Sequence, residues 1–82
     1  MIVKPNPATN QITLFIGNHK IVNTIQVFVY SVQGLLMDNF TLKAESRNEL
    51  EINTSKYPNG VYIIHSLADD GKVNAQKLII QK

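Results

Sequence analysis

Hydrophobic and polar residues alternate along most of this chain with a period of two, the pattern of β-strands that bury one face. Three runs show it clearly: "QITLFI" at 11–16, "IQVFVYS" at 25–31 and "NELEIN" at 48–53. The apolar positions that share a face in these runs are Ile12, Leu14 and Ile16, then Ile25, Val27 and Val29, then Leu50 and Ile52. β-Branched and aromatic residues dominate the runs, which also favours strands.

Further strands are predicted between and after these runs. The stretch "GVYIIHSL" at 60–67 is apolar on both faces, which predicts a strand covered on both sides. The final stretch, 72–82, places Leu78 and Ile80 opposite Lys77, Ile79 and Gln81. A short strand is predicted for "LLM" at 35–37, and a strand followed by a polar loop for "TLKAESRNEL" at 41–50.

Turn residues separate the runs. "PNPATN" at 5–10 contains two prolines, so it is predicted to be an ordered lead-in or edge segment and not a central strand. Turns are also predicted at Gly17-Asn18, at "SVQG" ending in Gly34, at "YPNG" ending in Gly60, and at Asp70-Gly71. About seven short strands at roughly ten-residue spacing predict an all-β fold, a small Ig-like antiparallel β-sandwich.

Composition narrows the function classes. With 82 residues, the chain is predicted to be one domain, and 44% hydrophobic residues argue against disorder. The absence of cysteine excludes disulfides and thiolate chemistry. The net charge is only +2 and the basic residues are scattered, so no nucleic-acid partner is predicted. No apolar run approaches the roughly 20 residues of a membrane-spanning helix, and no signal peptide is predicted within the first residues of this sequence.

No catalytic, cofactor or metal site is predicted. His19 and His65 have no ligand spacing between them, and Asp69 and Asp70 lack the spaced oxygens of a calcium loop. Three glutamates are predicted to face water, and the serines have no nucleophile motif; these residues are Glu45, Glu49 and Glu51, with Ser31, Ser46, Ser55 and Ser66. The aromatic residues could form a flat platform for sugar, although aromatic side chains in strands more often fill cores; they are Phe15, Phe28, Tyr30, Phe40, Tyr57 and Tyr62.

Three motifs in order resemble the C-terminal sorting domain of the type IX secretion system of Bacteroidetes-type bacteria. The first is the Val-x-Pro-Asn-Pro stretch at 3–7, with Pro5, Asn6 and Pro7. The second is a strand, a turn ending in Gly34 and a short apolar strand, over 27–37. The third is a Pro-x-Gly-x-Tyr segment followed by a hairpin turn and a last strand that carries Lys; its residues here are Pro58, Gly60, Tyr62, Gly71 and Lys77.

The sequence departs from the family pattern at a few positions. Ser31 stands where the family usually has Asp or Asn, and Leu35 where it has Lys or Arg. The usual Asp-x-Ser-x-Leu segment is represented by Asn53, Ser55 and Tyr57.

The resemblance implies that residues 1–82 are a single C-terminal sorting domain belonging to a larger secreted protein. Such a domain is non-catalytic and directs an upstream cargo domain through the outer-membrane type IX machinery. A sortase-like peptidase then typically removes it and attaches the cargo to the cell surface. The implied location is the periplasm in transit, then the cell surface or the extracellular space.

Two other functions share the predicted fold. One is an adhesive or carbohydrate-binding accessory module of a secreted enzyme. The other is a spacer or a homodimer formed by strand exchange, because open sandwich edges invite pairing. Within the sorting hypothesis, the final hairpin, Val61 to Lys82, is predicted to supply much of the recognised surface, with Lys77 and Lys82 as exposed charges.

Overall fold

A computed structural model describes residues 2–15, 24–43, 49–68 and 71–82. These residues form seven strands: β1 (Ile2–Lys4), β2 (Gln11–Phe15), β3 (Thr24–Ser31), β4 (Leu36–Lys43), β5 (Glu49–Asn53), β6 (Gly60–Ala68) and β7 (Val73–Ile80). The described part of the chain offers no helix with the length and apolar character needed to cross a membrane. The predicted all-β class is confirmed.

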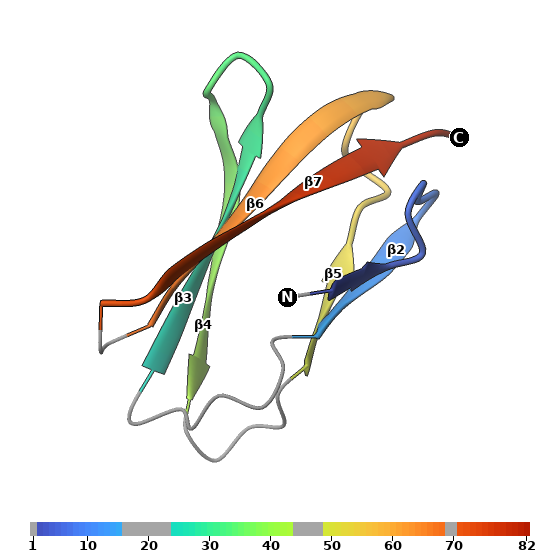
Figure 1. The fold of residues 1–82 in the computed structure, drawn as a ribbon. Coiled ribbons are helices and arrows are strands. Elements are labelled where there is room, and N and C mark those ends of the chain that lie inside the picture. Colours follow the sequence, from blue (N-terminus) through green and yellow to red (C-terminus); the bar gives the residue numbers. More distant parts are fainter. Residues whose placement is uncertain (1, 16–23, 44–48, 69–70) are drawn as a thin grey trace.

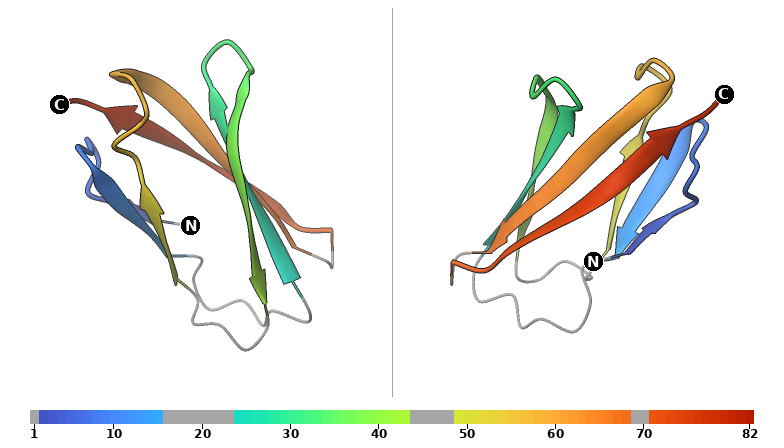
Figure 2. Two further views of the ribbon diagram at one scale, coloured as in Figure 1. Left: turned by 180° about the vertical axis from the view of Figure 1, so that it is seen from behind. Right: turned by 45° about the horizontal axis from the view of Figure 1, so that its top comes forward.

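The strands form two antiparallel sheets that face each other (Figure 1). One sheet has the order β1-β2-β5 and the other the order β4-β3-β6-β7. Two hairpins, β3-β4 and β6-β7, lie within the four-stranded sheet, while the chain changes sheet between β2 and β3, β4 and β5, and β5 and β6. This arrangement is that of a small Ig-like sandwich, and both layers can be followed in the two views of Figure 2.

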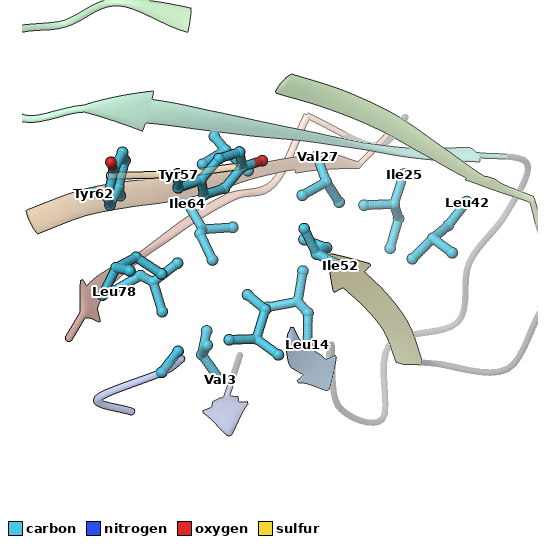
Figure 3. Packing of buried hydrophobic residues seen from close by; sticks show 14 residues of the cluster. Val3, Leu14, Ile25, Val27, Leu42, Ile52, Tyr57, Tyr62, Ile64 and Leu78 are labelled. Atoms are coloured by element: carbon cyan, nitrogen blue, oxygen red, sulfur yellow. The ribbon is translucent and has the colours of Figure 1, made fainter. Parts of the chain in front are cut away.

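The core lies between the two sheets and uses the residues that the alternation predicted (Figure 3). The predicted inward positions Ile12, Leu14, Ile25, Val27, Val29, Ile52, Leu78 and Ile80 are buried, and Leu50 is half-buried. Ile16 lies outside the described residues. The other residues of the cluster are Val3, Ala8, Leu42, Tyr57, Tyr62 and Ile64. Burial of each large apolar side chain stabilises the fold by about 1.5–3 kcal/mol.

Two strand predictions were wrong. In β6, Tyr62, Ile64 and Ser66 face the core, but Val61, Ile63 and His65 are only half-buried, so the strand is covered on one side only. The short strand at "LLM" and the strand in "TLK" are one continuous strand, β4. A register shift between Val29 and Tyr30 explains the broken alternation, because a bulge places one extra residue opposite its neighbour.

The turns predicted at Gly34, Gly60 and Gly71 are confirmed. Gly34, Gly60 and Gly71 have positive φ angles of 90°, 157° and 90°. The segment at 5–10, predicted to be an ordered lead-in or edge segment, follows a strand that was not predicted, β1, and its residue Ala8 pairs with the edge of β7. The predicted turn at Gly17-Asn18, the polar loop after Lys43 and Asp70 lie outside the described residues.

Gly60→Val is expected to destabilise the domain by more than about 1 kcal/mol, because a β-branched residue cannot relax at a φ of +157°. A Cβ atom at Gly60 would meet no neighbour within 4 Å, so the cost is one of backbone strain and not of a clash. Thermal denaturation should show a melting temperature roughly 4–8 °C lower. The exposed Lys56→Val in the same connection serves as control, and an unchanged melting temperature for Gly60→Val would contradict the strain.

Candidate functional site

The Pro-Asn-Pro motif pairs with the outer edge of β7. The side-chain amide of Asn6 donates through Nδ2 to the carbonyl oxygen of Lys77 at 3.0 Å, and its Oδ1 accepts from the Ile79 N–H at 3.0 Å. Ala8 continues the pairing, donating its N–H to the Ile79 oxygen and accepting from the Gln81 N–H, each at 2.8 Å. The Asn6 side chain thus extends the single parallel bridge that Ala8 forms with Ile80 of β7.

The connection between β5 and β6 contacts Lys82, which lies just after β7. The Lys82 N–H donates to Asn59 Oδ1 at 3.0 Å, and the Lys82 Nζ donates to the Ser55 carbonyl oxygen at 2.7 Å. The same connection is tied to the N-terminal segment, because buried Thr54 donates its N–H to the Asn10 oxygen at 2.8 Å. We call this set of contacts, between residues 5–10, 53–59 and 77–82, the terminal clasp.

Asn6→Ala is expected to cost about 1 kcal/mol of stability, because it removes two hydrogen bonds whose partners can then turn to water. The amide of Ile79 should exchange its hydrogen faster, while amides of β3 should not change. Asn10→Ala is the matched control, since Asn10 contributes its backbone oxygen to the clasp. Protection of Ile79 equal to that in the unmodified domain would rule out this role of Asn6.

In the Pro-x-Gly-x-Tyr motif, the last residue is hydrogen-bonded to the first. The Tyr62 hydroxyl donates to the Pro58 carbonyl oxygen at 2.6 Å, across the Gly60 turn. Tyr62 lies near the start of β6 and its ring is buried. A tyrosine that hydrogen-bonds the backbone just before its own strand is the tyrosine corner of Ig-like sandwiches. The spacing of the motif is therefore explained by the reach of one side chain.

Tyr62→Phe is expected to lower stability by about 1–2 kcal/mol, because the partly buried Pro58 carbonyl loses its donor while the ring remains packed. Chemical denaturation should show a lower midpoint with an unchanged slope. Tyr30→Phe removes a hydroxyl from the half-buried outer face of β3 and should change stability by less than about 0.5 kcal/mol. Equal effects of the two substitutions would mean that the corner bond contributes nothing.

A second tyrosine links this corner to β4. The Tyr57 hydroxyl donates to Asp38 Oδ2 at 3.2 Å, and its ring lies 5.4 Å from that of Tyr62. Burial, followed by the charge of Asp38, raises the pKa of Tyr57 well above its ordinary value near 10. The phenol therefore remains a hydrogen-bond donor at neutral pH, and the contact joins the connection between β5 and β6 to β4.

Ser31 and Asn53, which differ from the residues usual in the family, still make hydrogen bonds that stabilise turns. Ser31 Oγ accepts from the Leu35 N–H at 3.2 Å, and the Ser31 carbonyl accepts from the Gly34 N–H at 2.9 Å. Asn53 Oδ1 accepts from the Ser55 N–H at 2.9 Å, as an Asp side chain would in an Asx-turn. Gly71 donates to the Ala68 oxygen at 3.0 Å in the β6-β7 hairpin.

The outer face of the four-stranded sheet carries a groove of about 530 Å³. Phe28 and Tyr30 of β3 line it together with Ile63, His65 and Leu67 of β6. Phe28 and Tyr30 lie 6.2 Å apart with ring planes tilted by 31°, and the His65 ring meets Tyr30 edge-on at 5.4 Å. The lining of this groove is mainly apolar.

The six aromatic residues do not form one platform, and three of them fill the core instead, which was the alternative that the sequence favoured. Tyr57 and Tyr62 are buried between the sheets, and Phe40 packs against the core. Phe15 alternates with the inward-facing Leu14 and so lies on the outer face of the three-stranded sheet. This leaves Phe28 and Tyr30 on the other outer face.

The remaining candidate residues are separated from one another. Glu49 and Glu51 are exposed on β5, as predicted, and Lys77 and Lys82 are exposed at the end of the chain. His65 lies in the groove. His19, Glu45, Ser46, Asp69 and Asp70 lie outside the described residues.

The structure brings the first and third sequence motifs together at the terminal clasp, but Gly34 and Gly71 lie in turns of separate hairpins. Sequence reasoning missed Ala8, Thr54 and Asn59 as clasp residues. Of these, Ala8 could have been noticed because it is a small residue that follows two prolines. In the structure Ala8 is fully buried.

Comparison with known proteins identifies a family whose model spans all three sequence motifs. No curated protein matches the chain in sequence. A family model described as the secretion system C-terminal sorting domain matches residues 3–81, almost the whole chain. The match runs from the Val-x-Pro-Asn-Pro motif through the tyrosine corner to the end of β7. The chain therefore belongs to the family of secretion system C-terminal sorting domains, the export signals of the type IX secretion system.

Proposed function

We propose that this domain follows a cargo domain in a larger protein and directs that cargo through the type IX translocon of the outer membrane. The domain is non-catalytic, crosses the periplasm with its cargo, and is then removed by a sortase-like peptidase while the cargo is attached to the cell surface. The observation that carries the proposal is the family match over residues 3–81.

The geometry supports a signal that is recognised as a folded body. The motif residues Asn6, Pro58 and Tyr62 make contacts that hold β7 and the start of β6 in place. The side chains most available to a partner are instead exposed ones such as Lys77. The proposed recognised surface is the final hairpin, Val61 to Lys82, presented by this fixed framework.

A reporter fusion tests the proposed function. Residues 1–82 are placed behind a folded reporter with a periplasmic signal peptide and expressed in a bacterium that has a type IX system. The reporter is expected at the cell surface or in the medium, shortened by removal of the domain. In a strain without the translocon it should accumulate, uncut, in the periplasm. Equal distribution in the two strains would refute the proposal.

A carbohydrate-binding module is the second candidate function, favoured by the neighbouring rings of Phe28 and Tyr30 on the outer face. Titration of the isolated domain with soluble glycans, monitored by tyrosine fluorescence and calorimetry, separates the two functions. The sorting function predicts no saturable glycan binding. Binding that Phe28→Ala abolishes would instead support the module.

A homodimer formed by strand exchange is also testable. β4 and β7 are the edge strands of the four-stranded sheet, and edges pair readily. Residues 5–8 already cover part of the β7 edge. Light scattering coupled to size exclusion should therefore report a monomer at micromolar concentration, and a dimer would favour exchange through β4 or the start of β7.

A further inference from the structure

Side chains on the outer face of the four-stranded sheet form three cross-strand rows. In strand order β4, β3, β6 and β7, the rows are Leu36, Tyr30, Ile63 and Lys77; Asn39, Phe28, His65 and Ala75; and Thr41, Gln26, Leu67 and Val73. Leu36, Leu67 and Val73 are 49%, 41% and 61% exposed. The groove of about 530 Å³ crosses these rows, so the face combines exposed apolar groups with a concave shape. Such surfaces mark interaction sites more often than isolated apolar residues do.

The charges of the strand residues are distributed unequally between the two outer faces. On the four-stranded sheet, the described titratable side chains that alternate outward include Lys43, His65 and Lys77 and no carboxylate. Asp38 of β4 is half-buried and accepts from the Tyr57 hydroxyl. The exposed carboxylates of Glu49 and Glu51 belong to β5, in the other sheet.

The edge of β7 is less available than the face. Hydrogen-bonding groups of Lys77, Ile79 and Gln81 on that edge are already paired with Asn6 and Ala8. A partner strand could add there only by displacing the terminal clasp. The outer face can be contacted with every bond of the clasp intact.

We infer that the outer face of the four-stranded sheet docks a protein partner that presents a ridge of apolar side chains flanked by carboxylates. The apolar ridge fills the groove between Tyr30, Leu67 and Val73, and a carboxylate meets Lys77. The inference rests on the proposed function, and the partner is the component of the export machinery that receives the cargo.

Two other occupants fit the charges and the shape less well. A second copy of this chain would oppose two faces that both carry Lys43 and Lys77 and no carboxylate among the described outward residues, so the interface would lack complementary charges. A membrane surface suits protruding apolar groups, whereas this face is hollowed. A ridge with acidic flanks complements both the groove and the lysine.

The test uses the reporter fusion with substitutions at exposed positions. Leu67→Glu and Lys77→Glu alter the docking face, while Ile2→Glu and Lys4→Glu make the same changes on β1 of the other sheet. The two face variants are expected to lower export by about tenfold or more, because each places a carboxylate where the partner is expected to present apolar or acidic side chains. The two controls and Lys77→Arg should export normally, and all five variants should keep their melting temperature within a few degrees.

Each result decides between explanations. If the unmodified fusion is exported but the face variants are exported equally well, the docking face is refuted and the sorting function stands. If the unmodified fusion is not exported, the sorting function fails and the docking inference falls with it. A dimer in light scattering that Leu67→Glu converts to monomer would make the occupant a second copy. Flotation with phosphatidylethanolamine–phosphatidylglycerol vesicles, lost in Lys77→Glu, would make it a membrane; either result overturns the inference.

Discussion

Deletion of Gln76–Lys82 from an exported cargo is expected to abolish its surface display and leave it in the periplasm. The deletion removes Leu78 and Ile80 from the core, together with the β7 half of the terminal clasp. Without them, five residues of β6, from Gly60 to Ile64, lose their pairing partners on β7, and the outer face loses Lys77 beside the groove. Fractionation of cells followed by immunoblotting of a tagged cargo measures the outcome.

Gln81→Ala is the matched control for this deletion. Gln81 contributes its backbone N–H to the Ala8 oxygen, and that bond survives the substitution. Its side chain is exposed, so display should remain at the level of the unmodified cargo. Normal display of the truncated cargo would exclude the final hairpin as part of the signal.

Leu78→Ala is expected to destabilise the domain by about 2–5 kcal/mol, because Leu78 is fully buried and its loss leaves a cavity between the sheets. A chain of this size has only about 4–12 kcal/mol of stability, so much of it would be lost. The melting temperature, followed by circular dichroism, should fall by more than about 10 °C.

The neighbouring residue provides the control for Leu78→Ala. Ile79 is half-buried on the opposite face of β7, so Ile79→Ala should cost about 1 kcal/mol or less. The comparison tests the register of the strand, since a shift by one residue exchanges the two faces. A larger loss for Ile79→Ala than for Leu78→Ala would show that the assigned register is wrong.

Much of the fold could be predicted because alternation is a local property of the sequence. Leu14, Val27, Ile52 and Leu78 all face the core as their patterns indicated. The prediction failed at β6, where an apolar outer face was interpreted as burial under a second layer. The alternation of apolar and polar residues shows which face of a strand is apolar. It does not show whether an apolar face is covered by another layer of the protein or lines an open groove. β4 was divided because a bulge interrupts its period.

The site was less predictable than the fold. The Asn6 contacts reach residues 71 and 73 positions away in the sequence, and no local pattern encodes such a pairing. The Tyr62–Pro58 bond spans only four positions, so the tyrosine corner could have been identified from the Pro-x-Gly-x-Tyr spacing. The contact from Tyr57 to Asp38 required the relative placement of the two sheets.

The terminal clasp also sets the order in which the domain can be completed. Contacts between segments more than 70 positions apart are expected to form after the intervening strands have paired, because those pairings bring the two segments close together. During translation, residues 5–8 leave the ribosome long before residues 77–81 exist to receive them. A partly synthesised chain cannot display the finished edge of β7, so the folded shape is available only on polypeptides translated through that strand.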